Sequence, residues 1–265
     1  LPRTATEYRA GAAGARFRLT GEASFAHAFE TAWTAKLPFQ GYFADGAWEY
    51  LQSPDGRRPI KEAIRGAFAA AASELIAPMQ AATYPPLKHP FAPAGWGQGL
   101  VPDYNVLQAL LRAHALSGAP EILQALQTGS AHILGANPVG LSFTTGPGYR
   151  TIRHPLHEDH RAMGVDVPKG ITIYGWAPQS IAFFDWIFSP HAWAPLPDTT
   201  TRQGGASRRV EPNRLALPYF EYLIEHPALV VQQEYTVHQS IGSTAAMWLY
   251  LHSRLPFPSV QSDSH

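Results

Sequence analysis

Large apolar residues recur at helical spacing in separate blocks of this 265-residue chain. Within residues 24–37, steps of three and four residues place Phe25, Phe29, Ala32 and Trp33 on one face of a helix. The same pattern predicts helices over residues 60–79, 104–118 and 121–135, and a closing helix that begins at about residue 235. Gly118 and Gly135 are typical of helix ends. Alternating patterns are confined to short pieces such as 171–174, so the chain is predicted to be mainly α-helical.

Long polar or irregular segments separate these helices. Residues 137–175 are rich in Gly, Pro and His and predict an irregular stretch, and residues 199–209 predict a polar loop. A short apolar segment at 181–188 and a short helix at 218–224 are also expected. Antiparallel helix pairs with long loops on one side suggest a helical toroid or barrel with loops around its mouth. We expect a single domain over residues 1–265.

Composition and charge narrow the class of ligand. The 24 prolines, about 9% of the chain, exceed the usual value of about 5%, and 7 tryptophans and 11 tyrosines accompany them. Aromatic rings on loops suit the apolar faces of sugars, although core packing is the ordinary role of a single tryptophan. Twenty basic and twenty acidic residues cancel without long runs of either sign, so nothing suggests a nucleic acid or an anionic membrane as partner.

Three further features bear on the compartment and leave it open. The absence of cysteine excludes disulfides and thiolate metal sites. No apolar stretch approaches the roughly 18 residues that a membrane span requires. The first residues, LPRTATEYRAG, lack the basic head and apolar core of a signal peptide.

Glu234 stands where the closing helix is predicted to begin. One interpretation is a carboxylate that stabilises the helix N-terminus, typically by about 0.3–1 kcal/mol. The other is a general acid, which must stay protonated near the working pH and therefore needs dry surroundings or a neighbouring anion. Val230, Val231 and Tyr235 are candidates for such surroundings.

A cluster of histidines and carboxylates lies in the irregular stretch: His154, His157, Glu158, Asp159 and His160. Three histidines and two carboxylates are enough to bind zinc, but their spacing fits no helical HExxH pattern and Pro155 interrupts it. Two other interpretations are binding of a sugar hydroxyl by His157 and plain hydrogen bonding within the loop.

The segment AHILGANPVGLSFTTGPGYRTIRHPLHEDHR, residues 131–161, resembles glycoside hydrolase family 9, in which a helix ending YLLGRNP is followed by SFVTG and a histidine motif. The matching residues are Leu134, Gly135, Asn137, Pro138, Gly140, Ser142, Phe143, Thr145, Gly146 and Gly148. WGQG at 96–99 and GITIYGW at 170–176 resemble further elements of the family in the family's order. The resemblance covers roughly residues 25–253.

This resemblance implies an all-α (α/α)6 barrel and inverting hydrolysis of β-1,4-glycosidic bonds in a cellulose-like glucan or oligosaccharide. Glu234 takes the place of the family's general acid, and His157 that of a sugar-binding histidine. Four aromatic residues on the mouth loops would stack on sugar rings: Trp96, Tyr149, Tyr174 and Trp176. The resemblance implies no redox or organic cofactor and no catalytic metal, and it leaves room for a structural calcium.

The chain also departs from the family. Leu156, His157 and Glu158 replace His-His-Arg or His-Asp-Arg, and the usual WNAP after the acid is absent. An exo-acting enzyme of the same family, cleaving gluco- or glucosamino-oligosaccharides, is therefore the alternative activity.

The family's base comes from an N-terminal DAGD-type motif, which this sequence lacks, and only about half of the barrel's helices are predicted. We therefore expect the C-terminal part of a catalytic barrel, with its N-terminal half as partner in the same or another chain. An isolated chain without the base would be an inactive carbohydrate-binding piece. Secretion or export to the periplasm is expected by analogy alone.

Overall fold

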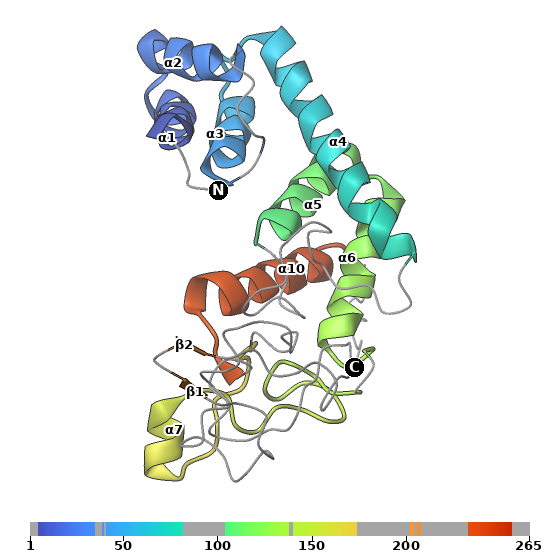
Figure 1. Ribbon diagram of the computed structural model, residues 1–265. Coiled ribbons are helices and arrows are strands. Elements are labelled where there is room, and N and C mark those ends of the chain that lie inside the picture. Colours follow the sequence, from blue (N-terminus) through green and yellow to red (C-terminus); the bar gives the residue numbers. More distant parts are fainter. Residues whose placement is uncertain are drawn as a thin grey trace, which may run out of the picture. The chain divides into compact units, whose positions relative to one another are not determined.

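The computed structural model describes residues 5–34, 39, 41–81, 104–137, 140–173, 202–203, 206–207 and 233–255. Its helices are α1 (Ala5–Thr20), α2 (Ala23–Thr34), α3 (Gly41–Gln52), α4 (Arg58–Ala81), α5 (Tyr104–Ser117), α6 (Pro120–Ile133), α7 (Glu158–Met163) and α10 (Gly242–His252), with a π-helical turn, η1 (Val237–Ile241), before α10 (Figure 1). Two short strands, β1 (Arg202–Gln203) and β2 (Ala206–Ser207), pair antiparallel. The chain forms two compact units: residues 1–76 with 108–122, and residues 77–107 with 123–265.

In the first unit, α1 and α3 lie side by side (Figure 1) and meet through glycines. A Cβ atom added at Gly14 would overlap the carbonyl oxygen of Gly46, and one added at Gly46 would lie 2.6 Å from the Cα atom of Gly11. Real Cβ atoms do not approach other atoms so closely, so no side chain fits between the two backbones. The contact therefore requires glycine at these positions.

Aromatic rings fill the space between α2 and α3. Phe29 is fully buried, and its ring centroid lies 4.7 Å from that of Tyr50 and 5.9 Å from that of Phe43. Both distances are within the range of favourable aromatic pairs. Burial of these large rings supplies much of the apolar area that stabilises the first unit.

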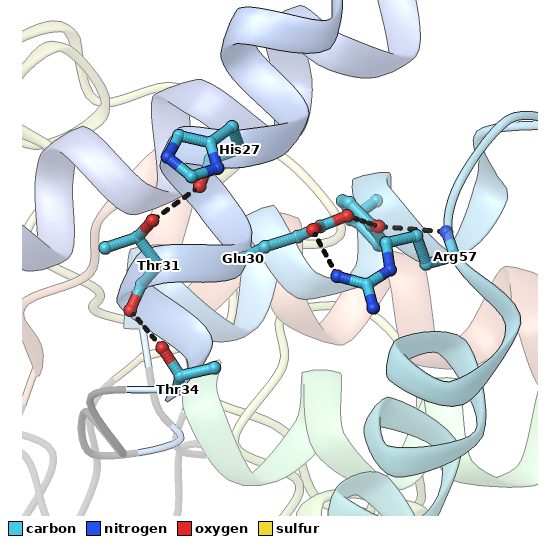
Figure 2. A network of polar contacts seen from close by, with 6 residues as sticks. His27, Glu30, Thr31, Thr34 and Arg57 are labelled. Atoms are coloured by element: carbon cyan, nitrogen blue, oxygen red, sulfur yellow. Dashed lines mark hydrogen bonds and ion pairs between the residues drawn. The ribbon is translucent and has the colours of Figure 1, made fainter.

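A small polar network ties the same helices to the turn before α4 (Figure 2). The Arg57 guanidinium donates to Glu30 Oε2 at 3.1 Å, and the Arg57 backbone N–H donates to the Tyr50 hydroxyl at 3.0 Å. The Tyr50 hydroxyl donates in turn to Glu30 Oε1. Burial, together with the hydrogen bond to Glu30, raises the pKa of Tyr50 to about 12. Figure 2 also shows the hydroxyls of Thr31 and Thr34 bonded to backbone oxygens within α2.

In the second unit, α10 is joined to α6 by a side-chain hydrogen bond. The Trp248 indole N–H donates to Ser130 Oγ at 2.9 Å, and Met247 beside it is fully buried. Before α10, the N–H of Ile241 donates to the carbonyl oxygen of Thr236 at 3.1 Å, five residues back, which is the bond that defines a π-helix.

The structure confirms the four helices predicted over residues 24–37, 60–79, 104–118 and 121–135, which are α2, α4, α5 and α6. Gly118 has φ 66° and Gly135 has φ 118°, as expected of residues that end helices. The closing helix, predicted from about residue 235, begins as η1 at Val237 and continues as an α-helix from Gly242.

Other elements were not expected from the sequence. Helices α1 and α3 lack a prediction, α7 lies within the stretch predicted to be irregular, and β1 and β2 lie within the predicted polar loop. The segments 181–188 and 218–224, and the residues Val230 and Val231, lie outside the described residues. The single domain over residues 1–265 stays a prediction. Among the helices described, none combines the length and the apolar character that a membrane crossing demands.

Candidate active site

The loop that follows α6 starts from a buried asparagine. The Asn137 side-chain nitrogen donates to the carbonyl oxygens of His132 and Leu141, each at 2.8 Å. The N–H of Leu141 donates back to Asn137 Oδ1 at 3.4 Å. Gly135, in the left-handed region, turns the chain out of the helix. One side chain therefore fixes the loop to the last turn of α6.

Residues 141–145 are hydrogen-bonded on both sides by backbone groups. Donors and acceptors pair as Ser142 N with Arg150 O (2.7 Å), Ile152 N with Ser142 O (3.2 Å), Ile173 N with Phe143 O (3.0 Å) and Thr145 N with Ile171 O (2.9 Å). The segment is almost completely buried. Residues 141–145 therefore hold two loop segments, 150–152 and 171–173, through backbone hydrogen bonds.

Buried hydroxyls complete this arrangement. Thr144 Oγ1 lies 2.8 Å from Thr172 Oγ1. Thr145 Oγ1 donates to the carbonyl oxygen of Pro168 at 2.6 Å and accepts from the N–H of Ile171 at 2.9 Å. Because buried backbone groups are costly when unpaired, these hydroxyls stabilise a loop that has little regular secondary structure.

Tyr149 lies on the turn that joins residues 141–145 to 150–152. Its ring is fully exposed, at 101% of the reference area. Gly146 and Gly148 precede it with φ of 99° and 97°, which only glycine adopts readily, and a Cβ atom at Gly148 would lie 2.8 Å from Ser142 Cβ. The turn is thus held against the buried segment while its aromatic ring extends into solvent.

His157 caps the N-terminus of α7. Its Nδ1 accepts from the backbone N–H of His160 at 3.1 Å, and its backbone is extended, with φ −119° and ψ 97°. A nitrogen that accepts carries no proton, so the neutral imidazole bears its proton on Nε2. Within the part of the chain that the structure describes, no residue accepts from Nε2. His157 therefore presents one N–H donor.

The loop that leads into α7, residues 153–157, is called the His157 loop, and it contacts the segment that carries Glu234. The N–H of Leu156 donates to the carbonyl oxygen of Gln233 at 2.8 Å. One residue after Leu156 and two residues after Gln233, the rings of His157 and Tyr235 stack, with centroids 6.5 Å apart and planes inclined by 15°. Glu234 lies between these two contacts in sequence. Residues almost 80 positions apart are thereby brought together.

Burial shapes the electrostatics of this segment. It raises the pKa of the Glu234 carboxyl above the ordinary 4.5, so the protonated form persists to higher pH. Burial also raises the pKa of the Tyr235 phenol, and the negative charge of Asp159 adds to that shift. Glu234 lies three residues before the start of η1, and among the described groups no helix N–H donates to its carboxylate. The N–H of Thr236 donates instead to Ser240 Oγ at 2.9 Å. The capping interpretation of Glu234 finds no support in these contacts.

Solved structures with a similar fold include endoglucanases of glycoside hydrolase family 9. A thermostable endoglucanase from Alicyclobacillus acidocaldarius aligns at 21% identity and TM-score 0.67, over 94% of this chain and 43% of its own. A metagenome-derived glycoside hydrolase family 9 endoglucanase aligns at 20% identity and TM-score 0.65, over 94% and 40%. A family 9 protein from Bacteroides ovatus aligns at 20% identity and TM-score 0.53, over 66% and 34%.

The chain has the fold of the family 9 helical barrel. It spans less than half the length of the structures it matches. No family model matches the sequence, and no curated protein matches it either. The resemblance to glycoside hydrolase family 9 and the all-α barrel fold are thus confirmed at the level of structure.

The structure describes only some of the predicted site residues. Glu234 and His157 come together, and Tyr149 lies on the loop bonded to the same buried segment as Ile152. Trp96, Tyr174 and Trp176 lie outside the described residues. Sequence reasoning missed the pairing of Tyr235 with His157, because a contact between distant segments leaves no periodic signal.

His157 and His160 form hydrogen bonds with backbone groups of their own loop. His157 Nδ1 receives the N–H of His160, and His160 Nδ1 lies 2.5 Å from the carbonyl oxygen of Val165. Both nitrogens are thereby engaged within the loop rather than directed at a common point. Among the described residues, no three His, Asp or Glu side chains are grouped closely enough to hold a metal ion.

Proposed function

We propose that this chain carries the proton-donor side of a glycoside hydrolase active site that cleaves β-1,4-glycosidic bonds in a cellulose-like glucan or oligosaccharide. The observation that carries the proposal is the position of Glu234. Its half-buried carboxyl, with a raised pKa, lies in sequence between two residues that contact the His157 loop. The family 9 endoglucanases with the same fold support the choice of substrate class.

Glu234 would protonate the departing sugar oxygen. A general acid works best when its pKa approaches the working pH, and burial moves the pKa of Glu234 in that direction. Inversion needs a second carboxylate roughly 6.5–9.5 Å away that deprotonates water on the opposite face of the sugar. We place that base outside this sequence, because no DAGD-type motif occurs in it.

The remaining residues would bind sugar. His157 offers its Nε2–H to a sugar hydroxyl, and the exposed ring of Tyr149 offers an apolar face for stacking. Trp96, Tyr174 and Trp176 keep the same stacking role as a proposal from the sequence alone.

The test compares leaving groups in the polypeptide as it is encoded, with any residues that flank this chain. Glu234→Gln should lower kcat/KM on cello-oligosaccharides by about 10²- to 10⁴-fold, because their poor leaving groups need the proton. It should have far less effect on dinitrophenyl glycosides, whose leaving groups depart without one. Glu121→Gln, an exposed helix position, is the control and should leave both rates unchanged. Equal losses on both substrates would contradict the role of proton donor.

Four further measurements decide the finer points. The first product formed should have the inverted anomeric configuration by NMR, and chain-length analysis separates endo cleavage, which gives mixed oligomers, from exo cleavage, which gives one small product. The alkaline limb of kcat/KM should lie above pH 4.5, since activity is lost as Glu234 gives up its proton. Residues 1–265 alone should bind oligosaccharides without hydrolysing them. Turnover by this segment, abolished by Glu234→Gln, would place the base within it.

A further inference from the structure

The geometry points to Tyr235 as a positioning residue. We propose that its ring, stacked on the imidazole of His157, fixes the Nε2–H of His157 as a donor to a sugar hydroxyl beside Glu234. This inference rests on the proposed function. It adds Tyr235, which follows Glu234 in the sequence and contacts His157.

Two contacts, one made by Gln233 and one by Tyr235, lie on either side of Glu234 in the sequence. The bond from Leu156 N to Gln233 O fixes the register of the two segments, and the ring pair of His157 and Tyr235 follows it. The planes of the rings are nearly parallel, at 15°, and the separation of 6.5 Å lies within the range of offset stacking. A shift of Tyr235 would therefore change the place of His157 relative to Glu234.

The imidazole of His157 is held in two independent ways. The cap bond from His160 N–H to Nδ1 fixes one edge of the ring, but a ring held by a single bond still tilts about it. The stack with Tyr235 supports one face and removes that freedom. Nε2–H, on the opposite side of the ring from Nδ1, is left as the group that can reach a ligand.

This arrangement requires the ring of Tyr235 and not its hydroxyl. Two variants test the ring and the hydroxyl separately. Tyr235→Phe removes the hydroxyl and keeps the stacking face, and Tyr235→Leu removes the stacking face while keeping an apolar side chain. In both variants the backbone bond from Leu156 to Gln233 is unchanged. A residue that merely filled space would tolerate leucine about as well as phenylalanine.

The first measurement is kinetic, on cello-oligosaccharides, in the encoded polypeptide. Tyr235→Phe should retain kcat/KM within about twofold, whereas Tyr235→Leu should lose about tenfold or more, since a misplaced contact can cost up to about 10²-fold. In a His157→Ala background, Tyr235→Leu should cause no further loss, because the donor it positions is already gone. Independent, additive losses from the two substitutions would overturn the inference.

The second measurement does not depend on hydrolysis. Proton NMR of the His157 ring should show a resonance shifted by the tyrosine ring current, retained in Tyr235→Phe and lost in Tyr235→Leu. An unchanged resonance in Tyr235→Leu would overturn the stack. If Glu234→Gln abolishes hydrolysis but Tyr235→Leu leaves kcat/KM intact, the positioning role fails alone. If no variant hydrolyses any glucan while the NMR result holds, the proposed function has failed and the stack has not.

Discussion

The contact between α1 and α3 and the loops around residues 141–173 achieve order by opposite means. In the helix pair, the backbones approach so closely that glycine is required at Gly14 and Gly46, and side-chain contacts such as the ring pair of Phe17 and Tyr50 lie beside this close approach. In the loops, the hydroxyls of Thr144 and Thr145 form hydrogen bonds with hydroxyl and backbone groups that lie more than 20 residues away in the sequence. The first arrangement depends on shape and the second on hydrogen-bond partners.

This difference explains where the candidate chemistry lies. Where two backbones touch, no side chain lies between them that could bind a ligand. Loops held by hydrogen bonds, by contrast, can keep exposed groups such as Tyr149 and the Nε2–H of His157 in fixed places. The following substitutions test the contrast, beginning with the one expected to cost the most stability.

The largest effect is expected from Gly14→Ala. The added Cβ atom meets the backbone of Gly46, which has no flexible end to move away, so α1 and α3 must separate. We expect the free energy of unfolding to fall by about 3 kcal/mol or more, measured by urea denaturation followed by circular dichroism.

The matched control is Gly66→Ala on α4, where nothing lies within 4 Å of the added atom. There the substitution should stabilise by up to about 1 kcal/mol, because alanine favours the helix. Equal effects at the two glycines would show that α1 and α3 are not packed backbone to backbone.

The second prediction concerns His132 in α6, a buried side chain whose ring nitrogens have no hydrogen-bond partner among the described residues. Burial lowers its pKa from 6.5 to about 4. The unfolded chain therefore takes up a proton at a higher pH than the folded chain, so stability is lost as the pH falls from 6.5 towards 4, by about 3 kcal/mol in total. Denaturation at a series of pH values should show that His132→Phe removes this component, while His27→Phe, at an exposed position, retains it.

The sequence predicted the fold where large side chains make the contacts. Phe29 and its neighbours mark α2 because their spacing follows the face that they bury. Helix α1 was not predicted because its buried face consists mainly of glycine and alanine, at Ala10, Gly11, Ala13 and Gly14, which give almost no apolar periodicity. Helix α3 was missed because Gly46 interrupts its pattern, although that glycine is what allows α1 to approach.

In the candidate site, too, some features were predicted from the sequence and others were not. Glu234 and His157 were predicted from resemblance to a family, since no local pattern relates two residues so far apart. The tautomer of His157 and its stack on Tyr235 depend on the cap of α7, a helix of 6 residues that is too short to show a period. Geometry of this kind arises from tertiary contacts, which periodicity and propensity do not encode.

A smaller loss of stability is expected from Thr145→Val, which keeps the shape of the side chain and removes its hydroxyl. The Ile171 N–H and the Pro168 carbonyl would each lose a bond in a buried place, at a cost of about 1–3 kcal/mol. Hydrogen exchange should show faster exchange of the Ile171 amide. Thr31→Val, which removes an exposed bond within α2, should cost little, and a comparable loss there would mean that burial of the hydroxyl is unimportant.

The smallest effect is expected from Asp159→Asn, which changes charge without changing packing. Asp159 is exposed, and its negative charge adds to the burial that raises the pKa of Tyr235. The substitution should lower the pKa of Tyr235 while leaving it above the ordinary 10.0, because burial, the larger cause, remains. The free energy of unfolding at neutral pH should not change, since the phenol is protonated there in both states. Titration of the tyrosine signals by NMR gives the measurement, with Tyr250 as internal reference because its raised pKa arises from burial without Asp159. An unchanged Tyr235 would mean that the start of α7 does not act on the segment that carries Glu234.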